Sequence, residues 1–113
     1  MMILKLKNYP RGWIIGDFTP AVLQTKAFEF CVKDYKAGDK EAKHVHKVAA
    51  EISVIVSGEF EMNGKRLKKG DILVMEPCTV GQFSCLKTGS LAVVKIPSVK
   101  GDKYMVEDNR KQK

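Results

Sequence analysis

Apolar and polar residues alternate along most of this chain with a period of two, the pattern of strands that bury one face. Residues 28–33 read Phe-Glu-Phe-Cys-Val-Lys, and residues 51–57 form a second such segment that is rich in β-branched side chains. One face of the second segment carries Ile52, Val54 and Val56, and the other carries Glu51, Ser53, Ile55 and Ser57. Residues 72–75 are apolar on both faces, which predicts a strand in a barrel wall or one covered on both sides, and residues 91–96 are predicted to form a further buried strand.

The pair Asn63-Gly64 is the strongest hairpin signal in the chain, because both residues accept the positive φ of a type I′ turn. A two-residue loop there places Glu61 opposite Arg66 and Phe60 opposite Leu67. Opposite charges and apolar side chains that face each other across a strand pair support this register.

Glycine-containing turns at 36–39, 68–71 and 87–90 separate these short segments at near-regular spacing. Many short strands with such turns predict an all-β sandwich or closed barrel. Residues 21–26 are the one plausible helical stretch, and they are too few to change the class. We expect one domain over residues 1–105 and a frayed basic tail over residues 106–113.

Composition narrows the possible partners. The net charge of +7 permits nucleic acid, an anionic membrane or an anionic small molecule, but the basic residues are scattered and match no nucleic-acid-binding signature. No apolar run approaches the roughly 20 residues that span a bilayer. We therefore expect a cytoplasmic protein with a small-molecule ligand, no nucleic-acid partner and no membrane contact. The three cysteines are predicted to be reduced.

The candidate chemistry lies at the only two histidines, His44 and His46, which point to one face if they lie on a strand. After a short link the next strand opens with Glu51, which falls beside His46 if the two strands pair as a hairpin. Two imidazoles and a carboxylate form a facial triad suited to Fe(II), Mn(II), Zn(II) or Ni(II). Two surface histidines and a solvated acidic residue would give the same pattern, so both interpretations stay open at this point.

The flanking glycines add a family resemblance. Gly38, His44, His46, Glu51 and Gly58 together resemble the first motif of the cupin superfamily in residue type and spacing. Gly70-Asp71, followed by Pro77, looks like the start of the second cupin motif. The resemblance covers roughly residues 26–96 and implies a single-domain antiparallel β-barrel of the double-stranded β-helix or jelly-roll type. It further implies a homodimer, with one divalent metal ion held by His44, His46 and Glu51.

The second motif departs from the family pattern at its metal ligand. The position of the family's fourth ligand, a histidine, falls on Gly81, and the neighbouring Gln82 becomes a tentative ligand if the strand shifts by one residue. By strand parity, Ser53, Ile55 and Phe83 are expected to line the cavity. Cys78 and Cys85 lie near this region in sequence and are taken as inert core residues.

Two functions follow from the resemblance. The first is a metal-dependent enzyme that acts on a small anionic metabolite by metal-centred oxygenation or isomerisation. The second is a non-catalytic cupin that binds or senses a metabolite or carbohydrate, with or without metal. No third histidine exists, so a general base has to be another side chain such as Glu29, Lys33, Glu59 or Glu61, whose direction the period of two does not decide.

Overall fold

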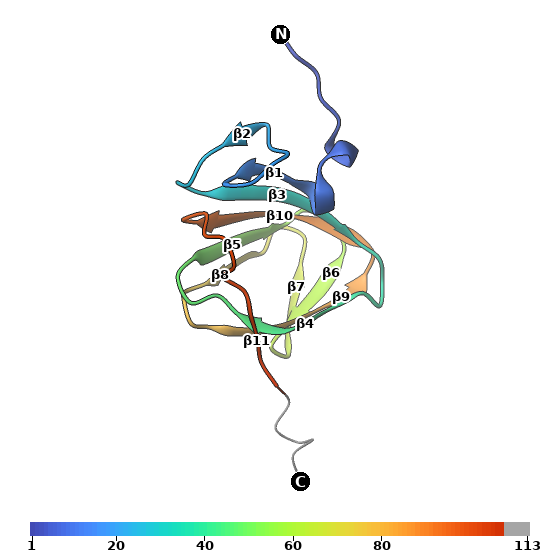
Figure 1. Cartoon of the computed structure of the whole chain (residues 1–113). Helices are drawn as coiled ribbons and strands as arrows, with labels where there is room; N and C mark the ends of the chain where they lie inside the picture. The colour runs from blue at the N-terminus through green and yellow to red at the C-terminus, as the bar shows by residue number, and fades with distance from the viewer. Residues whose placement is uncertain (108–113) are drawn as a thin grey trace.

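The computed structural model describes residues 1–107 and contains two sheets that face each other (Figure 1). One sheet has six strands in the order β2-β1-β3-β10-β5-β8, and the other has five in the order β11-β4-β9-β6-β7. The strands of the first sheet are β1 (Trp13–Gly16), β2 (Leu23–Gln24), β3 (Glu29–Tyr35), β5 (Ala50–Ile55), β8 (Ile72–Met75) and β10 (Gly89–Ile96). Those of the second are β4 (Lys40–Val45), β6 (Glu59–Met62), β7 (Lys65–Lys68), β9 (Val80–Lys87) and β11 (Tyr104–Met105).

Two short 3-10 turns, Leu6–Asn8 and Pro10–Gly12, precede β1. Every strand pair is antiparallel except β1 with β2, so the predicted all-β antiparallel class is confirmed. Within residues 1–107 there is no helix long and apolar enough to cross a membrane. Residues 108–113, most of the predicted basic tail, lie outside the described part of the chain.

The predicted hairpin forms with the predicted register. Glu61 pairs with Arg66 and Phe60 with Leu67 across β6 and β7. Asn63 has a φ of 52° and Gly64 a φ of 80°, the left-handed conformations that a type I′ turn requires.

The core lies between the sheets and is built from alternate residues of several strands. Its buried apolar members are Cys31, Ile55, Phe60, Met62, Phe83, Cys85, Leu91 and Val93. The opposite face of the first sheet is partly open, because Val54, Ile72 and Val74 are exposed on β5 and β8. Residues 72–75 therefore lie in the barrel wall, one of the two arrangements expected, and only the inner face of the strand is covered.

Two local predictions were wrong. Residues 21–26 are not helical, because the backbone N–H of Val22 donates to Ile14 and that of Thr25 donates to Gly16. These bonds draw the segment alongside β1 as the short parallel strand β2. The strand with the histidines does not pair with the strand that opens at Glu51 either, since β4 and β5 belong to different sheets. The link between them crosses from one wall of the barrel to the other.

Candidate functional site

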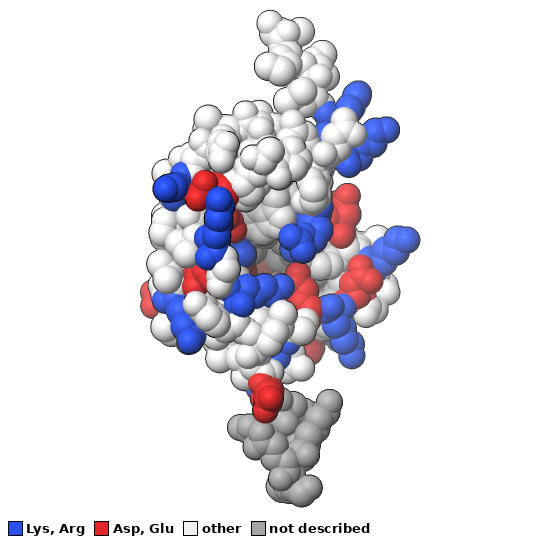
Figure 2. All heavy atoms as spheres, viewed as in Figure 1, with Lys and Arg blue, Asp and Glu red and all other residues white. Residues whose placement is uncertain are grey.

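A cavity of about 530 Å³ opens between the two sheets. Its size lies within the range of about 300–1,000 Å³ that is usual for small-molecule sites. Figure 2, viewed as in Figure 1, shows a hollow with basic and acidic side chains around its mouth. The inner faces of β3, β4, β5 and β10 form its walls, and segments before β1 and after β10 contribute to its lining. The terminal regions of the fold thus help to enclose the space.

His44 and His46 line this cavity from β4 and the residue just beyond it. The Nδ1 of His44 lies 2.7 Å from the carbonyl oxygen of Ala42, and the Nδ1 of His46 lies 2.6 Å from that of Asp102. A carbonyl only accepts hydrogen bonds, so each Nδ1 carries the proton and donates. Nε2 of each ring is therefore the nitrogen left for a ligand, the arrangement found in metal-ligating histidines.

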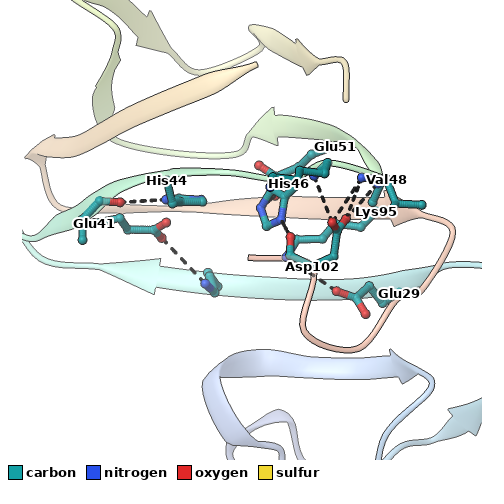
Figure 3. Close-up of polar contacts among 12 residues, drawn as sticks. Glu29, Glu41, His44, His46, Val48, Glu51, Lys95 and Asp102 are labelled. Carbon is teal, nitrogen blue, oxygen red and sulfur yellow. Dashed lines mark hydrogen bonds and ion pairs between the residues drawn. The ribbon is translucent and has the colours of Figure 1, made fainter. Parts of the chain in front are cut away.

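Glu51 reaches the same region from the opposite sheet, with its Oε1 3.8 Å from the Nε2 of His46. The pKa of His46 lies below its usual value, chiefly because burial disfavours the charged ring and the nearby Lys95 ammonium adds repulsion. His46 is therefore neutral at physiological pH, as a metal ligand or a proton acceptor has to be. Figure 3 shows these side chains between the two walls.

The register of the first sheet places Lys95 beside Glu51. Lys95 of β10 pairs with Glu51 of β5 on one side and with Glu29 of β3 on the other. Because these three residues share a face, a row of alternating charge crosses the cavity wall. The Nζ of Lys95 lies 3.6 Å from Oε1 of Glu29, and the hydroxyl of Ser98 donates to the other oxygen of that carboxylate at 2.8 Å.

A second polar group lies on the side of His44. The phenol of Tyr35 donates to Oε2 of Glu41, and the Nζ of Lys33 lies 3.7 Å from the same oxygen. Burial would raise the pKa of Glu41, but the Tyr35 hydrogen bond and the charges of Lys33 and Lys103 outweigh it, so the pKa lies below its usual value. Burial and the hydrogen bond to Glu41 raise the pKa of Tyr35, which keeps the phenol protonated.

The sequence singled out neither Glu41 nor Lys95 as site residues. A register irregularity between Glu41 and His44 turns both side chains into the cavity, although an unbroken strand would direct residues three apart to opposite faces. No sequence signal marks that irregularity. Glu29 and Lys33, two of the four alternatives for a general base, line the cavity, whereas Glu59 and Glu61 do not.

Asp102 is a further residue that the sequence did not indicate. It is buried and accepts hydrogen bonds from the backbone N–H groups of Lys47, Val48 and Ala49 at 2.9–3.2 Å. Its carboxylate thereby fixes the link that follows His46, and its own carbonyl accepts the hydrogen bond from that ring. Asp102, which follows β10 in the chain, thus positions both the loop after His46 and the imidazole of His46, as Figure 3 shows.

Not all of the residues predicted to line the cavity do so in the structure. Ser53 and Phe83 do line it, whereas Ile55 is packed deeper, in the core. Gln82 is exposed and is not among the residues that line the cavity, and its backbone N–H donates to Oδ1 of Asn63. No register shift turns Gln82 inward, so the structure does not bring this tentative ligand to the site.

The cysteines are placed differently from one another. Cys85 is buried in the core, and Cys78 is exposed. Cys31 lines the cavity, where burial raises the pKa of its thiol to about 12. A thiol with so high a pKa stays protonated and is a poor nucleophile at neutral pH.

The register between β4 and β9 places Gly81, the position expected for the family's fourth metal ligand, next to His44. Gly81 pairs directly with His44, so a side chain there would project beside that imidazole. A Cβ on Gly81 would lie 3.2 Å from the sulfur of Met62 and 3.2 Å from the terminal methyl of Met75. Thioether side chains therefore flank the place where a histidine would lie.

The remaining donors fit a divalent metal in their chemistry. Each imidazole uses Nδ1 for a backbone carbonyl and leaves Nε2 for a ligand, and the ring centroids lie 5.1 Å apart. Glu51 adds a carboxylate next to His46. Within residues 1–107, however, no three His, Cys, Asp or Glu side chains are close enough together to form a metal-binding group. The donor types match the implied metal, whereas a closed three-ligand site is not formed.

The charges in the cavity do not follow the charge of the whole chain. Its basic lining residues are Arg11, Lys33, Lys95, Lys100 and Lys103, and its acidic ones are Asp17, Glu29, Glu41, Glu51, Glu76 and Asp102. Acidic and basic groups are thus nearly balanced around the ligand space. The excess of basic residues that gives the chain its net charge of +7 therefore lies outside the cavity lining and does not indicate an anionic ligand.

A barrel of two facing sheets with imidazoles and a carboxylate on its inner walls is the arrangement of a cupin-type fold, and similar solved structures agree. An uncharacterised conserved protein with a double-stranded β-helix domain from Klebsiella pneumoniae is 25% identical, with a TM-score of 0.70 over 94% of this chain and 92% of that chain. An RmlC-like cupin from Shewanella frigidimarina is 22% identical, with a TM-score of 0.61 over 67% of this chain and 71% of that one.

The DMSP lyase DddQ from Ruegeria pomeroyi is 18% identical, with a TM-score of 0.67 over 92% of this chain and 59% of that chain. No protein-family model and no curated protein matches the sequence. The chain is a small cupin by fold, as the sequence resemblance implied.

Proposed function

We propose that this cupin binds a small polar metabolite in its cavity and acts on it at a divalent metal ion held by His44, His46 and Glu51. The observation that carries the proposal is the contact between Nδ1 of each histidine and a backbone carbonyl oxygen. Each ring donates its Nδ1 proton to a backbone carbonyl and keeps Nε2 for a ligand. Iron, manganese, zinc and nickel all accept two imidazoles and a carboxylate.

A bound metal would supply Lewis-acid chemistry suited to isomerisation of the metabolite or, if it is a redox-active metal such as iron or manganese, electron transfer suited to oxygenation by dioxygen. The chain itself supplies the side chains that bind the ligand and those that hold or transfer protons. Lys95 lies next to Glu51 and can donate hydrogen bonds to a ligand, and Tyr35 keeps its proton at the other side of the cavity. That one protein of similar fold is a lyase supports an enzymatic role for such a cavity.

A second candidate function is metal-free binding of the metabolite. It is favoured by Gly81, which offers no ligand beside His44, and by the methionine side chains that flank this position. In that case the neutral His46 and the carboxylate of Glu51 are hydrogen-bonding groups for the ligand. The metabolite then leaves the cavity unchanged.

Metal content distinguishes the two candidates. The untagged full chain is purified without chelator, and its metals are quantified by elemental mass spectrometry beside His44→Ala, Glu51→Ala and Gln82→Ala. The exposed Gln82 is the matched control, since its side chain lies outside the cavity. Near-stoichiometric metal that both site variants lose and Gln82→Ala keeps would support the metal-dependent function. A native protein that takes up no metal, even after anaerobic reloading, would contradict it.

A further inference from the structure

Two lysine–glutamate pairs on the cavity wall are held just beyond hydrogen-bonding distance. The Nζ of Lys33 lies 3.7 Å from Oε2 of Glu41, and the Nζ of Lys95 lies 3.6 Å from Oε1 of Glu29. Direct hydrogen bonds between such ions measure about 2.7–2.9 Å. All four side chains are 15–24% exposed and face the cavity.

A lysine–glutamate pair on the outer surface is in direct contact instead. Lys87 and Glu59 approach to 2.7 Å, and the lysine is 75% exposed. In the cavity, each charge has a second contact that draws it away from its partner. The two ammonium groups lie over the ring of Trp13, at 5.6 Å for Lys33 and 5.0 Å for Lys95. Trp13 therefore holds both lysines by cation–π attraction.

The two carboxylates are anchored as well. Glu41 accepts the hydrogen bond of the Tyr35 phenol, and Glu29 accepts that of the Ser98 hydroxyl at 2.8 Å. In each pair, therefore, a lysine ammonium is a fixed donor and a glutamate carboxylate is a fixed acceptor, with 3.6–3.7 Å between the two atoms. Groups that are ordered before the ligand arrives lower the entropic cost of binding it.

We infer that these two pairs bind hydroxyl groups of the ligand, and that the cavity accepts a polyhydroxylated molecule such as a small sugar or polyol. A hydroxyl accepts a hydrogen bond from an ammonium group and donates one to a carboxylate, so it satisfies both members of a pair at once. An anion in the same place would face Glu29, Glu41 and the nearby Glu51, and a cation would face the two lysines. This inference rests on the proposed function only in that the ligand occupies the same cavity.

The row of alternating charge on the cavity wall connects the lysine–glutamate pairs with the candidate metal site. Lys95 pairs with Glu29 on one side and with Glu51 on the other, so a hydroxyl bound at Lys95 lies next to the carboxylate of the candidate metal site. The Lys33–Glu41 pair lies on the side of His44, where Glu41 and His44 both face the cavity. A ligand with several hydroxyl groups is thereby held across the candidate metal site rather than apart from it.

Binding of hydroxylated probes tests this inference. The full chain is titrated with D-glucose, D-xylose, myo-inositol and sorbitol, and with succinate and inorganic phosphate as anions without this pattern of hydroxyls. Binding is measured by saturation-transfer NMR and by the shift in thermal unfolding. The double variant Glu29→Met/Lys95→Met removes one pair without changing the net charge of the chain, and Glu59→Met/Lys87→Met removes the surface pair as the matched control.

We expect at least one sugar or polyol to bind the native chain. Its affinity for the Glu29→Met/Lys95→Met variant should be lower by a factor of about ten or more, since hydrogen bonds to charged groups are lost. The surface variant should bind as the native chain does. Lys33→Met provides a second variant should the double variant fail to fold by circular dichroism.

Three results would overturn the inference: no binding of any hydroxylated probe, equal binding by the cavity and surface variants, or tighter binding of succinate or phosphate than of every sugar. Metal content is measured on the same samples. Sugar binding that depends on the cavity pair in a chain that holds no metal would overturn the proposed metal function and leave this inference standing.

Discussion

Single residues at this site act mainly by fixing their neighbours. Asp102 is the clearest example, because one buried carboxylate accepts hydrogen bonds from three successive backbone N–H groups. Burial alone would raise its pKa, but these three hydrogen bonds outweigh burial and lower it. The loop after His46 thus depends on a residue more than fifty positions away in the chain.

Replacing Asp102 with Ala is expected to lower the free energy of unfolding by about 3 kcal/mol, because it leaves backbone donors buried without acceptors. Asp71 offers a matched control, since it accepts one backbone hydrogen bond in an exposed turn. Asp71→Ala should cost about 1 kcal/mol or less. Urea unfolding monitored by circular dichroism measures both, and equal losses would contradict the role assigned to Asp102.

Tyr35 sets the ionisation of Glu41. Because the pKa of Glu41 lies below its usual value in the folded chain, this residue stabilises the fold above the pKa it has when unfolded, and the contribution is lost as the pH falls. Tyr35→Phe removes a hydrogen bond to the charged form, so the pKa of Glu41 should rise and the loss of stability on acidification should become smaller. Lys33, Lys103 and His44, whose charges also lower this pKa, stay in place.

The measurement is the NMR shift of the Glu41 side-chain carboxyl carbon against pH, in the native chain and in Tyr35→Phe. Tyr104→Phe is the control, because Tyr104 is exposed and contacts Lys47 instead. An unchanged Glu41 titration in Tyr35→Phe would show that the phenol does not determine it.

At the scale of elements, the turns explain why two glycines of the first cupin-like motif differ in importance. Gly38 and Gly58 both have positive φ, 96° and 80°. A Cβ on Gly38 would meet nothing within 4 Å, whereas one on Gly58 would lie 2.5 Å from the carbonyl oxygen of Lys87 and 2.7 Å from the Cα of Gly89. Here the turn after β5 packs backbone to backbone against the turn between β9 and β10.

Gly58→Ala is therefore expected to destabilise the fold by about 3 kcal/mol or more, from left-handed strain and backbone overlap together. Gly38→Ala carries the strain alone and should cost about 1–2 kcal/mol. Thermal and urea unfolding of the two variants provide the comparison. Equal losses in the free energy of unfolding for the two variants would show that the contact between the two turns does not contribute to stability.

At the scale of the whole molecule, the outer face of the first sheet is unusually apolar. Val54, Val56, Ile72 and Val74 are 39–63% exposed on β5, the turn that follows it and β8, and β8 is the last strand of its sheet. Large exposed apolar patches and free sheet edges are typical of surfaces that a partner covers. The homodimer that the family resemblance implies would use this face, as a two-fold contact between identical patches.

We expect the full chain to be a dimer by size-exclusion chromatography with light scattering, and Ile72→Lys to convert it to a folded monomer by placing a charge in the contact. Lys65→Glu, in the exposed β6–β7 hairpin of the other sheet, is the control and should leave the dimer intact. A native chain that is monomeric at every concentration measured would contradict a dimer through this face.

The sequence by itself determined much of this protein, and for local reasons. Period-two alternation predicted the strands, because successive side chains on a strand point to opposite faces. The residue pair Asn63-Gly64, which accepts positive φ, predicted the hairpin and its register. The spacing of Gly38, His44, His46, Glu51 and Gly58 indicated the fold family and candidate metal donors without knowledge of which strands pair.

Only the tertiary structure decided what those strands enclose. Alternation does not say which face points inward, and in β3 the inner face carries Glu29, Cys31 and Lys33 instead of Phe30 and Val32. It does not reveal that β4 and β5 lie in opposite sheets, that an irregular register turns Glu41 inward, or that Asp102 returns to hold the loop after His46. These features depend on contacts between residues distant in the chain, so no local pattern in the sequence specifies them.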